Sequence, residues 1–203
     1  MPTVRPATPD EIPRVGEALA AAFADDPVWS WLASPRASWS ERAAAWFAAE
    51  ARTQLRGHGE VLVDDELRGA ALWSSPGHWQ TKPSESVALL LPSLRLFRSR
   101  SVRGLRTVSA MEAKHPKARL HWYLAVLGTD PAHQGHGVGS ALIRAVTDRC
   151  DEQGLPAYLE VVEGAERAVL RSARLRGHRG AGAGRRADHV VDVAGAKGMR
   201  DRR

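Results

Sequence analysis

The chain has 203 residues, of which 43% are hydrophobic, and it contains a single cysteine. That length suits one domain with a well-packed core, while one cysteine excludes an internal disulfide framework and fits a reducing compartment. No stretch approaches the roughly 18 uninterrupted apolar residues of a membrane span, and the N-terminus lacks a secretory signal pattern. We therefore expect a cytoplasmic protein, monomeric or homodimeric, with no membrane partner.

The net charge of +6 belongs entirely to the end of the chain. Residues 161–203 hold 11 Lys and Arg against 5 Asp and Glu, which leaves 18 basic and 18 acidic residues in 1–160. The same C-terminal stretch has 7 of the 18 glycines and none of the 12 aromatic residues. We therefore divide the chain into a globular domain, 1–160, and an Arg/Gly-rich tail, 161–203, which is expected to be disordered or poorly packed.

Hydrophobic periodicity and turn residues predict alternating strands and helices in the first 160 residues. The predicted strands are 3–5, 60–64, 68–73, 121–127 and 157–160. The predicted helices are 9–23, begun by a Thr8/Glu11 capping box and ended at Asp26-Pro27, then 39–55, a segment 83–118 interrupted at Pro92, and one that ends near Cys150. This order indicates an α/β domain around a mixed sheet. In the tail, Val190 to Val193 is a stretch that could still pair as a strand.

The most informative stretch joins the strand 121–127 to the last predicted helix. After Asp130-Pro131 it reads Gln-Gly-His-Gly-Val-Gly-Ser from Gln134 to Ser140. Alternating glycines at a strand-to-helix junction let backbone N–H groups approach a ligand, and the helix N-terminus adds partial positive charge. These properties favour a phosphate or pyrophosphate. The spacing fits neither G-x-G-x-x-G nor a P-loop, which would end in Gly-Lys-Ser/Thr.

With this spacing, the loop resembles the Gln/Arg-x-x-Gly-x-Gly/Ala loop of the GCN5-related N-acetyltransferases (GNAT), and the first 160 residues resemble that fold throughout. Within the superfamily the chain is similar to the puromycin N-acetyltransferases and their actinobacterial relatives. The stretches that carry the likeness are 3–8, 19–27, 73–76, 121–142 and 154–160. The resemblance implies an acyl-CoA N-acyltransferase fold with a mixed, mostly antiparallel sheet. It also implies acetyl transfer from acetyl-CoA to the amine of a small molecule.

The same resemblance implies which residues bind the cofactor. Val126, Leu127 and Gly128 would offer main-chain groups to the pantetheine arm, and an N–H near residue 126 or 127 would stabilise the oxyanion. The residues that would hold the pyrophosphate are Gln134, Gly135, His136, Gly137, Val138, Gly139 and Ser140.

Glu160 is the candidate catalytic residue, acting as a base through water, although a carboxylate at a strand end is as often a structural hydrogen-bond acceptor. The family's usual general acid is a tyrosine in a segment reading approximately Asn-x-x-x-Tyr-x-x-x-Gly-Phe, shortly after the strand that holds Glu160. No such segment exists in the chain.

Reverse translation accounts for that gap. Val161 to Arg179 can be encoded so that the frame one base later reads SSKERNVPFYARHGFEVTG, which contains the missing Asn, Tyr and Gly-Phe. Asp188 to Ala196 can likewise give TMWWMWREP, similar to the family's tryptophan-rich last strand. We therefore hypothesise that one inserted base near codon 161 put the tail in an offset frame, which leaves Leu170 where the tyrosine would stand. The C-terminal part of the fold would then be degraded and the activity impaired.

Other residues have less specific interpretations. No carboxylate or cysteine at metal-ligand spacing accompanies His121, His133 and His136, so we expect solvent-facing loop histidines and no metal. Cys150 is expected to be a half-buried helix residue rather than a nucleophile. The basic series from Arg95 to Arg106 is expected to be a solvated helix face, with contact to CoA phosphates as the alternative. Tryptophans 29, 31, 73 and 79 are expected to pack in the core or on the surface, one or two of them facing the substrate.

The alternative function is nucleic-acid binding through the basic tail. The offset-frame hypothesis argues against it, because the basicity of the tail would then reflect GC-rich codons, so we expect no nucleic-acid partner.

Overall fold

The computed structural model describes residues 2–33, 36–104, 106–107, 115–116, 119–161 and 189–192. In this part of the chain the strands are β1 (Val4–Pro6), β2 (Gly59–Asp64), β3 (Gly69–Ser74), β4 (Trp122–Thr129), β5 (Ala157–Val161) and β6 (His189–Asp192). The helices are α1 (Ile12–Ala22), α2 (Pro27–Leu32), α3 (Trp39–Arg56), α4 (Pro83–Phe97) and α6 (Val138–Gln153), with 3-10 turns at Pro9–Glu11, Arg36–Ser38, Arg98–Arg100 and Pro131–His133.

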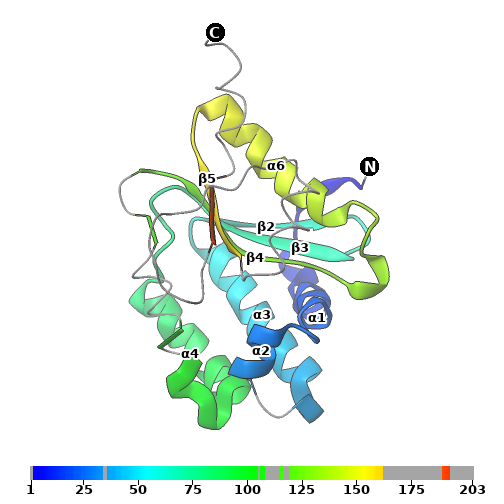
Figure 1. The fold of residues 1–203 in the computed structure, drawn as a ribbon, viewed down its shortest axis with the longest axis vertical. Helices are drawn as coiled ribbons and strands as arrows, with labels where there is room; N and C mark the ends of the chain where they lie inside the picture. The colour runs from blue at the N-terminus through cyan, green and yellow to red at the C-terminus, as the bar shows by residue number, and fades with distance from the viewer. Residues whose placement is uncertain are drawn as a thin grey trace.

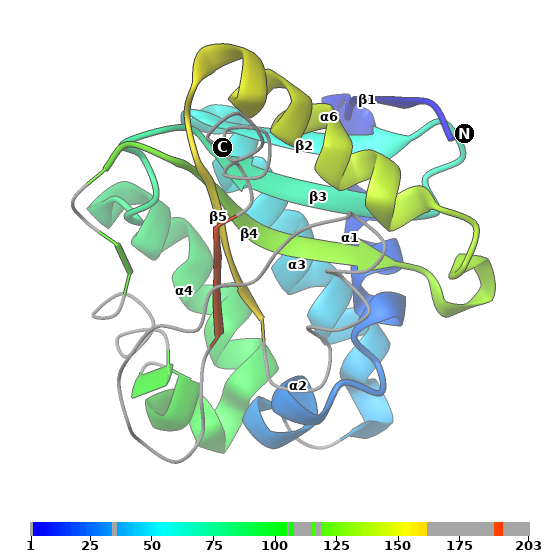
Figure 2. The same ribbon diagram turned by 45° about the horizontal axis from the view of Figure 1, so that its top comes forward.

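The strands form one sheet in the order β1-β2-β3-β4-β5-β6 (Figures 1 and 2). Every neighbouring pair is antiparallel except β4 and β5, which are parallel. The predicted mixed, mostly antiparallel α/β fold is thereby confirmed. The predicted strand in the tail is also confirmed for residues 190–192, which pair with β5, whereas Val193 lies outside the described residues.

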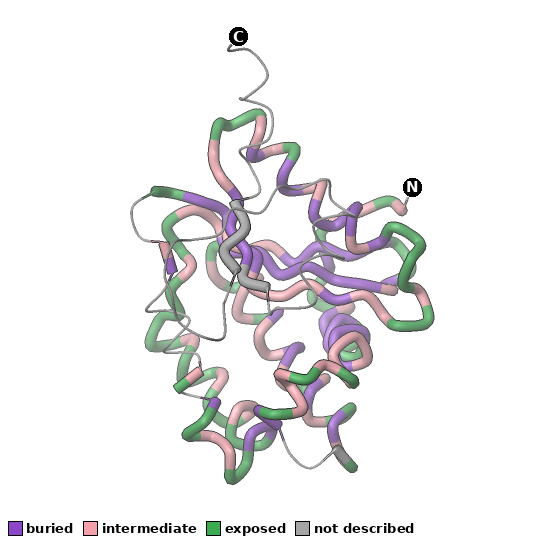
Figure 3. Tube along the Cα trace, in the orientation of Figure 1, coloured by how far each residue is buried: buried purple, intermediate pink, exposed green. Residues whose placement is uncertain are grey.

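Helices cover both faces of the sheet and divide its core in two (Figures 1 and 3). On one face α1, α3 and the end of α4 bury aliphatic residues of β2 and β3 together with Phe47 and Leu96. On the other face α6 packs Leu142 and Val146 against Trp73, Leu124 and neighbouring strand residues. Successive side chains along the central strands therefore pack against helices on opposite faces. A shift of one residue would move buried side chains to the wrong face, so this packing fixes the register of the sheet.

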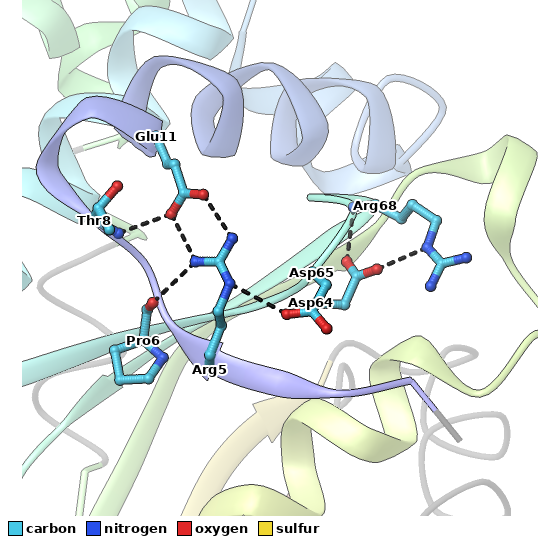
Figure 4. A network of polar contacts seen from close by, with 7 residues as sticks. All are labelled: Arg5, Pro6, Thr8, Glu11, Asp64, Asp65 and Arg68. Atoms are coloured by element: carbon cyan, nitrogen blue, oxygen red, sulfur yellow. Dashed lines mark hydrogen bonds and ion pairs between the residues drawn. The ribbon is translucent and has the colours of Figure 1, made fainter.

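The start of the chain is fastened to the sheet by charged groups (Figure 4). The Glu11 carboxylate accepts hydrogen bonds from the Arg5 guanidinium, at 2.6 and 2.8 Å, and from the Thr8 backbone N–H at 2.9 Å. Arg5 also pairs with Asp65 in the β2–β3 turn at 3.2 Å. The bonds from Arg5 and Thr8 lower the pKa of Glu11 to about 2. The predicted capping interaction is present, with a 3-10 turn ahead of α1.

Two local predictions are wrong. Asp26-Pro27 begins α2 instead of only ending the preceding helix: the Asp26 carboxylate accepts from the backbone N–H groups of Val28 and Trp29, at 2.8 and 2.9 Å. An N-cap carboxylate followed by proline at the first helical position is a start signal. Pro92 does not interrupt its segment, because α4 continues through it from Pro83 to Phe97.

The predictions for the tail fall mainly outside the described residues. Among residues 161–203 the structure describes 161 and 189–192 only, so the expected disorder and the position of Leu170 stay predictions. No helix in the described part of the chain is both long enough and apolar enough to span a membrane.

Candidate functional site

The centre of the candidate site is β4, whose regular pairing with β3 is broken by one extra residue. Leu72 pairs with Val126, but Trp73 pairs with Leu124, so Ala125 forms a bulge. A bulge twists the strand and redirects the main-chain groups beside it. The residues predicted to contact the pantetheine arm, 126–128, begin immediately after this bulge.

The parallel pairing of β4 with β5 stops at the same place. Trp122 to Leu124 pair with Ala157 to Leu159, and no further pair joins the two strands within the described residues. Figure 2 shows β5 leaving the line of β4 from there on. Main-chain groups of β4 after Leu124 that point toward β5 therefore lie along an opening between two strands, where an extended ligand could hydrogen-bond to them.

The three predicted pantetheine residues differ in what their positions require. Val126 packs toward α1 and α3, whereas Leu127 packs toward α6, as alternate residues of a strand do. A Cβ on Gly128 would come within 2.8 Å of both Ala22 and Leu19 of α1. Glycine at 128 is thus explained by the close packing of α1 on β4, independently of any ligand.

The loop after β4 is held by short-range hydrogen bonds. The Asp130 carboxylate accepts from the Ala132 backbone N–H at 2.9 Å, which caps the 3-10 turn Pro131–His133. The Gln134 side-chain amide donates to the carbonyl of Thr129 at 3.2 Å. Gln134, predicted to bind pyrophosphate, therefore ties the loop to the end of β4 in this structure.

Two glycines of the loop have backbone conformations that side chains disfavour. Gly135 and Gly137 have φ of 80° and 82°, the left-handed region, and a Cβ on either would meet no atom within 4 Å. Their requirement for glycine is therefore conformational, and both are exposed. The open space around them is where a ligand could approach the main chain.

Gly137 is also the N-cap of α6, and the first turn of that helix contains Val138, Gly139 and Ser140. Backbone N–H groups in a first helical turn have no intrahelical acceptor, and the helix dipole makes them attractive to anions. The side chains of Val138 and Ser140 are buried, whereas His136 is exposed. The predicted pyrophosphate residues thus form one continuous loop and helix start.

Glu160 lies on β5, in register with Val190 of β6. That position is beyond the last β4–β5 pair, on the strand that borders the opening. Its backbone is described and its side chain is not, so its role as a base stays a prediction.

One histidine prediction is wrong. His136 is exposed and His133 partly exposed, but His121, just ahead of β4, is only 5% exposed, and its Nε2 lies 2.8 Å from His115 Nε2. Within the described residues no group of three His, Cys, Asp or Glu side chains could hold a metal ion.

Cys150 is more deeply buried than predicted, on the face of α6 that packs on the sheet. Burial raises the pKa of its thiol to about 11, so at neutral pH it is protonated and a poor nucleophile.

Sequence reasoning missed a polar aromatic cluster at the opposite end of β4. It packs on the face that α3 and α4 cover, and its members are Trp79, His115, His121, Tyr123 and Tyr158. Tyr123 and Tyr158 are register partners on β4 and β5, one pair before the strands separate. The sequence does place one tyrosine in each of the two strands, Tyr123 and Tyr158. Predicting that they lie side by side would have required knowing that β4 pairs with β5 in this register.

The candidate site lies in a segment that matches a known family. The model of the acetyltransferase (GNAT) family matches residues 105–177, which include β4, the loop and α6 and continue past Glu160.

Over about 95% of its length the chain matches solved acetyltransferases in fold. A Corynebacterium glutamicum structure, described as histone acetyltransferase HPA2 and related acetyltransferase, is 24% identical over 94% of each chain, with a TM-score of 0.63. Arylalkylamine N-acetyltransferase 2 from Aedes aegypti is 13% identical over 95% of this chain and 98% of its own, with a TM-score of 0.60. A putative acetyltransferase of the GNAT family from Desulfovibrio desulfuricans is 12% identical over 95% and 97%, with a TM-score of 0.51. The chain thus has the GNAT acetyltransferase fold, and its glycine loop lies within the segment that matches the family.

Proposed function

We propose that the chain belongs to the acetyl-CoA-dependent N-acetyltransferases and that its site is built to transfer an acetyl group to the amine of a small molecule. The observation that carries the proposal is the continuity of two features: the exposed glycine loop at the start of α6 and the opening where β4 and β5 separate. Together they offer main-chain donors to a pyrophosphate and, next to it, an extended strand edge to a pantetheine arm.

The residues of the loop and of the start of α6 have the properties that a pyrophosphate ligand needs. The left-handed glycines 135 and 137 leave open space over the loop. The first turn of α6 supplies N–H groups and the positive end of a helix dipole. On this proposal Gln134 keeps the loop against β4, and residues 126–128 would bind the pantetheine amides through their main chain.

Acetyl-CoA, when bound, supplies the thioester whose acetyl group is transferred. A neutral amine attacks the thioester carbonyl, the C–S bond breaks, and the proton lost by the nitrogen balances the one taken up by the thiolate. A main-chain N–H near the Ala125 bulge would stabilise the oxyanion. Glu160 would accept the amine proton through a water molecule.

We also propose that the tail from Val161 is translated in an offset frame, which removes the general acid and impairs the activity of this form. The support is that residues 161–179 can be encoded so that the offset reading contains the expected Asn, Tyr and Gly-Phe at the family's spacing. The family match in the printed frame continues to residue 177, which is past the proposed insertion near codon 161. An offset frame by itself does not predict a match in that part of the chain. The codons for residues 161–179 decide the matter, because codons that do not spell that segment one base later would refute it.

The similarity to puromycin N-acetyltransferases extends the proposal to a small-molecule acceptor. Support comes from sequence stretches alone, and the acceptor would be found by screening amines with acetyl-CoA and measuring thiol release.

Calorimetric titration of the full chain with CoA tests the cofactor half without depending on turnover. We expect saturable binding that is weakened in Gly137→Ala and unchanged in Gly154→Ala. Gly154 is a matched control, because it has φ of 65° with open space around its Cβ and ends the same helix at the far side. Absence of CoA binding by the wild-type chain would overturn the proposal.

A further inference from the structure

Helix α4 turns an apolar face to solvent. Its exposed large residues, called here the α4 stripe, are Val87, Leu90, Leu91 and Leu94, which are 72%, 57%, 54% and 49% exposed. Their spacing of three and four residues places them on one face of the helix. A single exposed apolar residue is ordinary, but a contiguous row of four is typical of a surface that binds a partner.

The opposite side of α4 is attached to α3, so the fold itself sets this orientation. Trp46 Nε1 donates to the Ser93 hydroxyl at 3.0 Å. The Arg42 guanidinium donates to the carbonyl of Leu96 at 2.9 Å, and Leu96 and Phe97 are buried in the core beside α3. α4 lies at the outer edge of the helices on this face of the sheet, at the lower left of Figure 1. The helix could not rotate to bury its stripe without breaking these contacts.

The charges that accompany the α4 stripe are basic. Residues 86–111 contain five arginines and no Asp or Glu, and Arg95 and Arg98 are exposed at the C-terminal end of α4. Glu85 is the one acidic residue of α4, and its carboxylate lies toward the end of α3, where its Oε1 would be 3.2 Å from a Cβ on Gly57. An apolar stripe with basic neighbours complements a surface that is apolar within and anionic outside.

An exposed tryptophan is fastened to the same basic segment. Trp31, in α2, is 51% exposed, and the Arg103 guanidinium lies 4.6 Å from the centre of its ring and donates to its carbonyl at 3.1 Å. Arg100 donates to the carbonyls of Ser30 and Ala33, at 3.2 Å each. The end of α2 is thereby tied to the segment that follows α4. Exposed tryptophan and leucine together with arginine are typical of elements that lie on a membrane surface.

We propose that α4 and the basic segment after it form a docking surface for an anionic lipid bilayer, with the α4 stripe among the acyl chains and Arg95 and Arg98 among the headgroups. The charge favours a bilayer over a second copy, because both copies would bring the same basic segment to the interface. The prominence of the stripe favours a bilayer over a peptide, since protruding side chains offer no groove. No membrane partner was expected because the chain lacks a spanning stretch, but a helix in the plane of the membrane does not need one. The surface does not depend on acetyl transfer.

Sedimentation of the full chain with lipid vesicles tests the proposal. The anionic vesicles contain one part phosphatidylglycerol to three parts phosphatidylcholine, and pure phosphatidylcholine vesicles are the comparison. We expect binding to the anionic vesicles that weakens when salt rises from about 0.1 M to about 0.5 M, because screening shortens the reach of the arginines. Equal binding to both lipids would overturn the proposal. So would no binding to the anionic vesicles, which would leave a soluble acidic partner as the occupant.

Substitutions in α4 separate this surface from the basic tail, which also attracts anionic vesicles. Leu90→Gln with Leu91→Gln should weaken binding about 10- to 100-fold, because roughly half of each leucine is available for insertion. Both side chains are exposed, so the urea midpoint should stay near that of the wild-type chain. Binding through the tail alone would be unchanged in this variant, and that result would overturn the proposal.

Arg95→Gln with Arg98→Gln should weaken binding about 30-fold, since one arginine near an anionic surface contributes about a factor of five. Arg14→Gln with Arg52→Gln is the matched control, because both residues are exposed on other helices and the loss of charge is the same. The control should bind almost like the wild-type chain. Equal losses in the two variants would mean that only the net charge matters, against the proposal.

Sedimentation velocity without vesicles tests a second copy as the occupant. We expect the wild-type chain and Leu90→Gln with Leu91→Gln to have the same oligomeric state. A wild-type dimer that this double substitution dissociates would assign the α4 stripe to a second copy and overturn the proposal.

Discussion

The two ends of β4 differ in which groups they expose or bury. The end that leads to α6 exposes main-chain groups, whereas the end where the strand begins is packed with side chains. The end that leads to α6 displays glycines, N–H groups and exposed positions, so it leaves room for a ligand. The end that begins the strand is filled by rings that pack on one another 3.8 to 5.9 Å apart. The same strand thus joins an open, backbone-lined end to a closed, side-chain-lined end.

The difference shows why the two ends were not equally visible in the sequence. Glycines 135 and 137 are read from local spacing, since the left-handed conformation and the helix start depend on neighbours in the chain. The cluster around His115 depends on the pairing of β4 with β5 and on the path of a long connection. Its members come from positions 79, 115 to 123 and 158, and no local pattern brings them together.

Most helices and strands were predictable because they too depend on neighbours in the chain. α3 and the β2–β3 hairpin follow from periodicity and turn residues, and their observed bounds differ from the predicted ones by one residue at most at each end. The helix through Pro92 was not, because tertiary contacts, such as Leu96 buried against α3, outweigh the local penalty of proline. The bulge at Ala125 was not predictable either, since it exists only relative to β3.

The largest expected effect comes from restoring the reading frame after residue 160. This tests whether the chain lacks only the C-terminal segment that would carry the general acid. If the tail is offset, the restored chain should gain about 100- to 10,000-fold in the rate of thiol release from acetyl-CoA with a suitable amine, since a general acid contributes that much. Phe in place of the restored tyrosine should remove most of the gain. Leu170→Tyr in the present chain should change nothing, because the surrounding segment stays scrambled.

Next in size is the effect of a side chain at the open end. Gly137→Ala puts a Cβ at φ of 82°, which costs about 1–2 kcal/mol for an L-residue. We expect about tenfold weaker CoA binding, since 1.4 kcal/mol corresponds to a factor of ten. Gly154→Ala, with φ of 65°, should lower the melting temperature similarly but bind CoA like the wild-type chain. Equal losses of binding in both variants would mean that the loop conformation does not serve the ligand.

A smaller effect is expected where β4 meets α1, between the two ends. A Cβ at position 128 would lie 2.8 Å from Ala22 and Leu19, so Gly128→Ala must push α1 outward. Overpacking of this kind costs about 1–3 kcal/mol, measured as a fall in the urea midpoint. Gly139→Ala is the control, because its Cβ would be 3.5 Å from the Thr129 hydroxyl, an ordinary contact. A wild-type midpoint for Gly128→Ala would show that α1 yields without cost.

The smallest effect concerns a carboxyl group near the closed end. Ser74, the register partner of Tyr123, donates to the Gln54 side-chain oxygen at 3.3 Å, and the Gln54 amide reaches Glu50 at 3.5 Å. Burial raises the pKa of Glu50, so the folded state binds more protons than the unfolded state above the ordinary glutamate range. Folding is therefore penalised as pH rises from the ordinary glutamate range through the raised pKa of Glu50.

Glu50→Gln removes that penalty and keeps a side-chain oxygen that can accept from Gln54. We expect a gain of about 1 kcal/mol in unfolding free energy at pH 7, the usual scale of a single substitution, and no gain near pH 4, where the wild-type carboxyl is protonated. Urea unfolding at both pH values measures it. A gain at pH 4 as large as that at pH 7 would assign the effect to packing rather than to charge. The closed end would then be limited by the fit of its side chains, whereas a gain confined to pH 7 would mean that the buried charge of the carboxylate destabilises it.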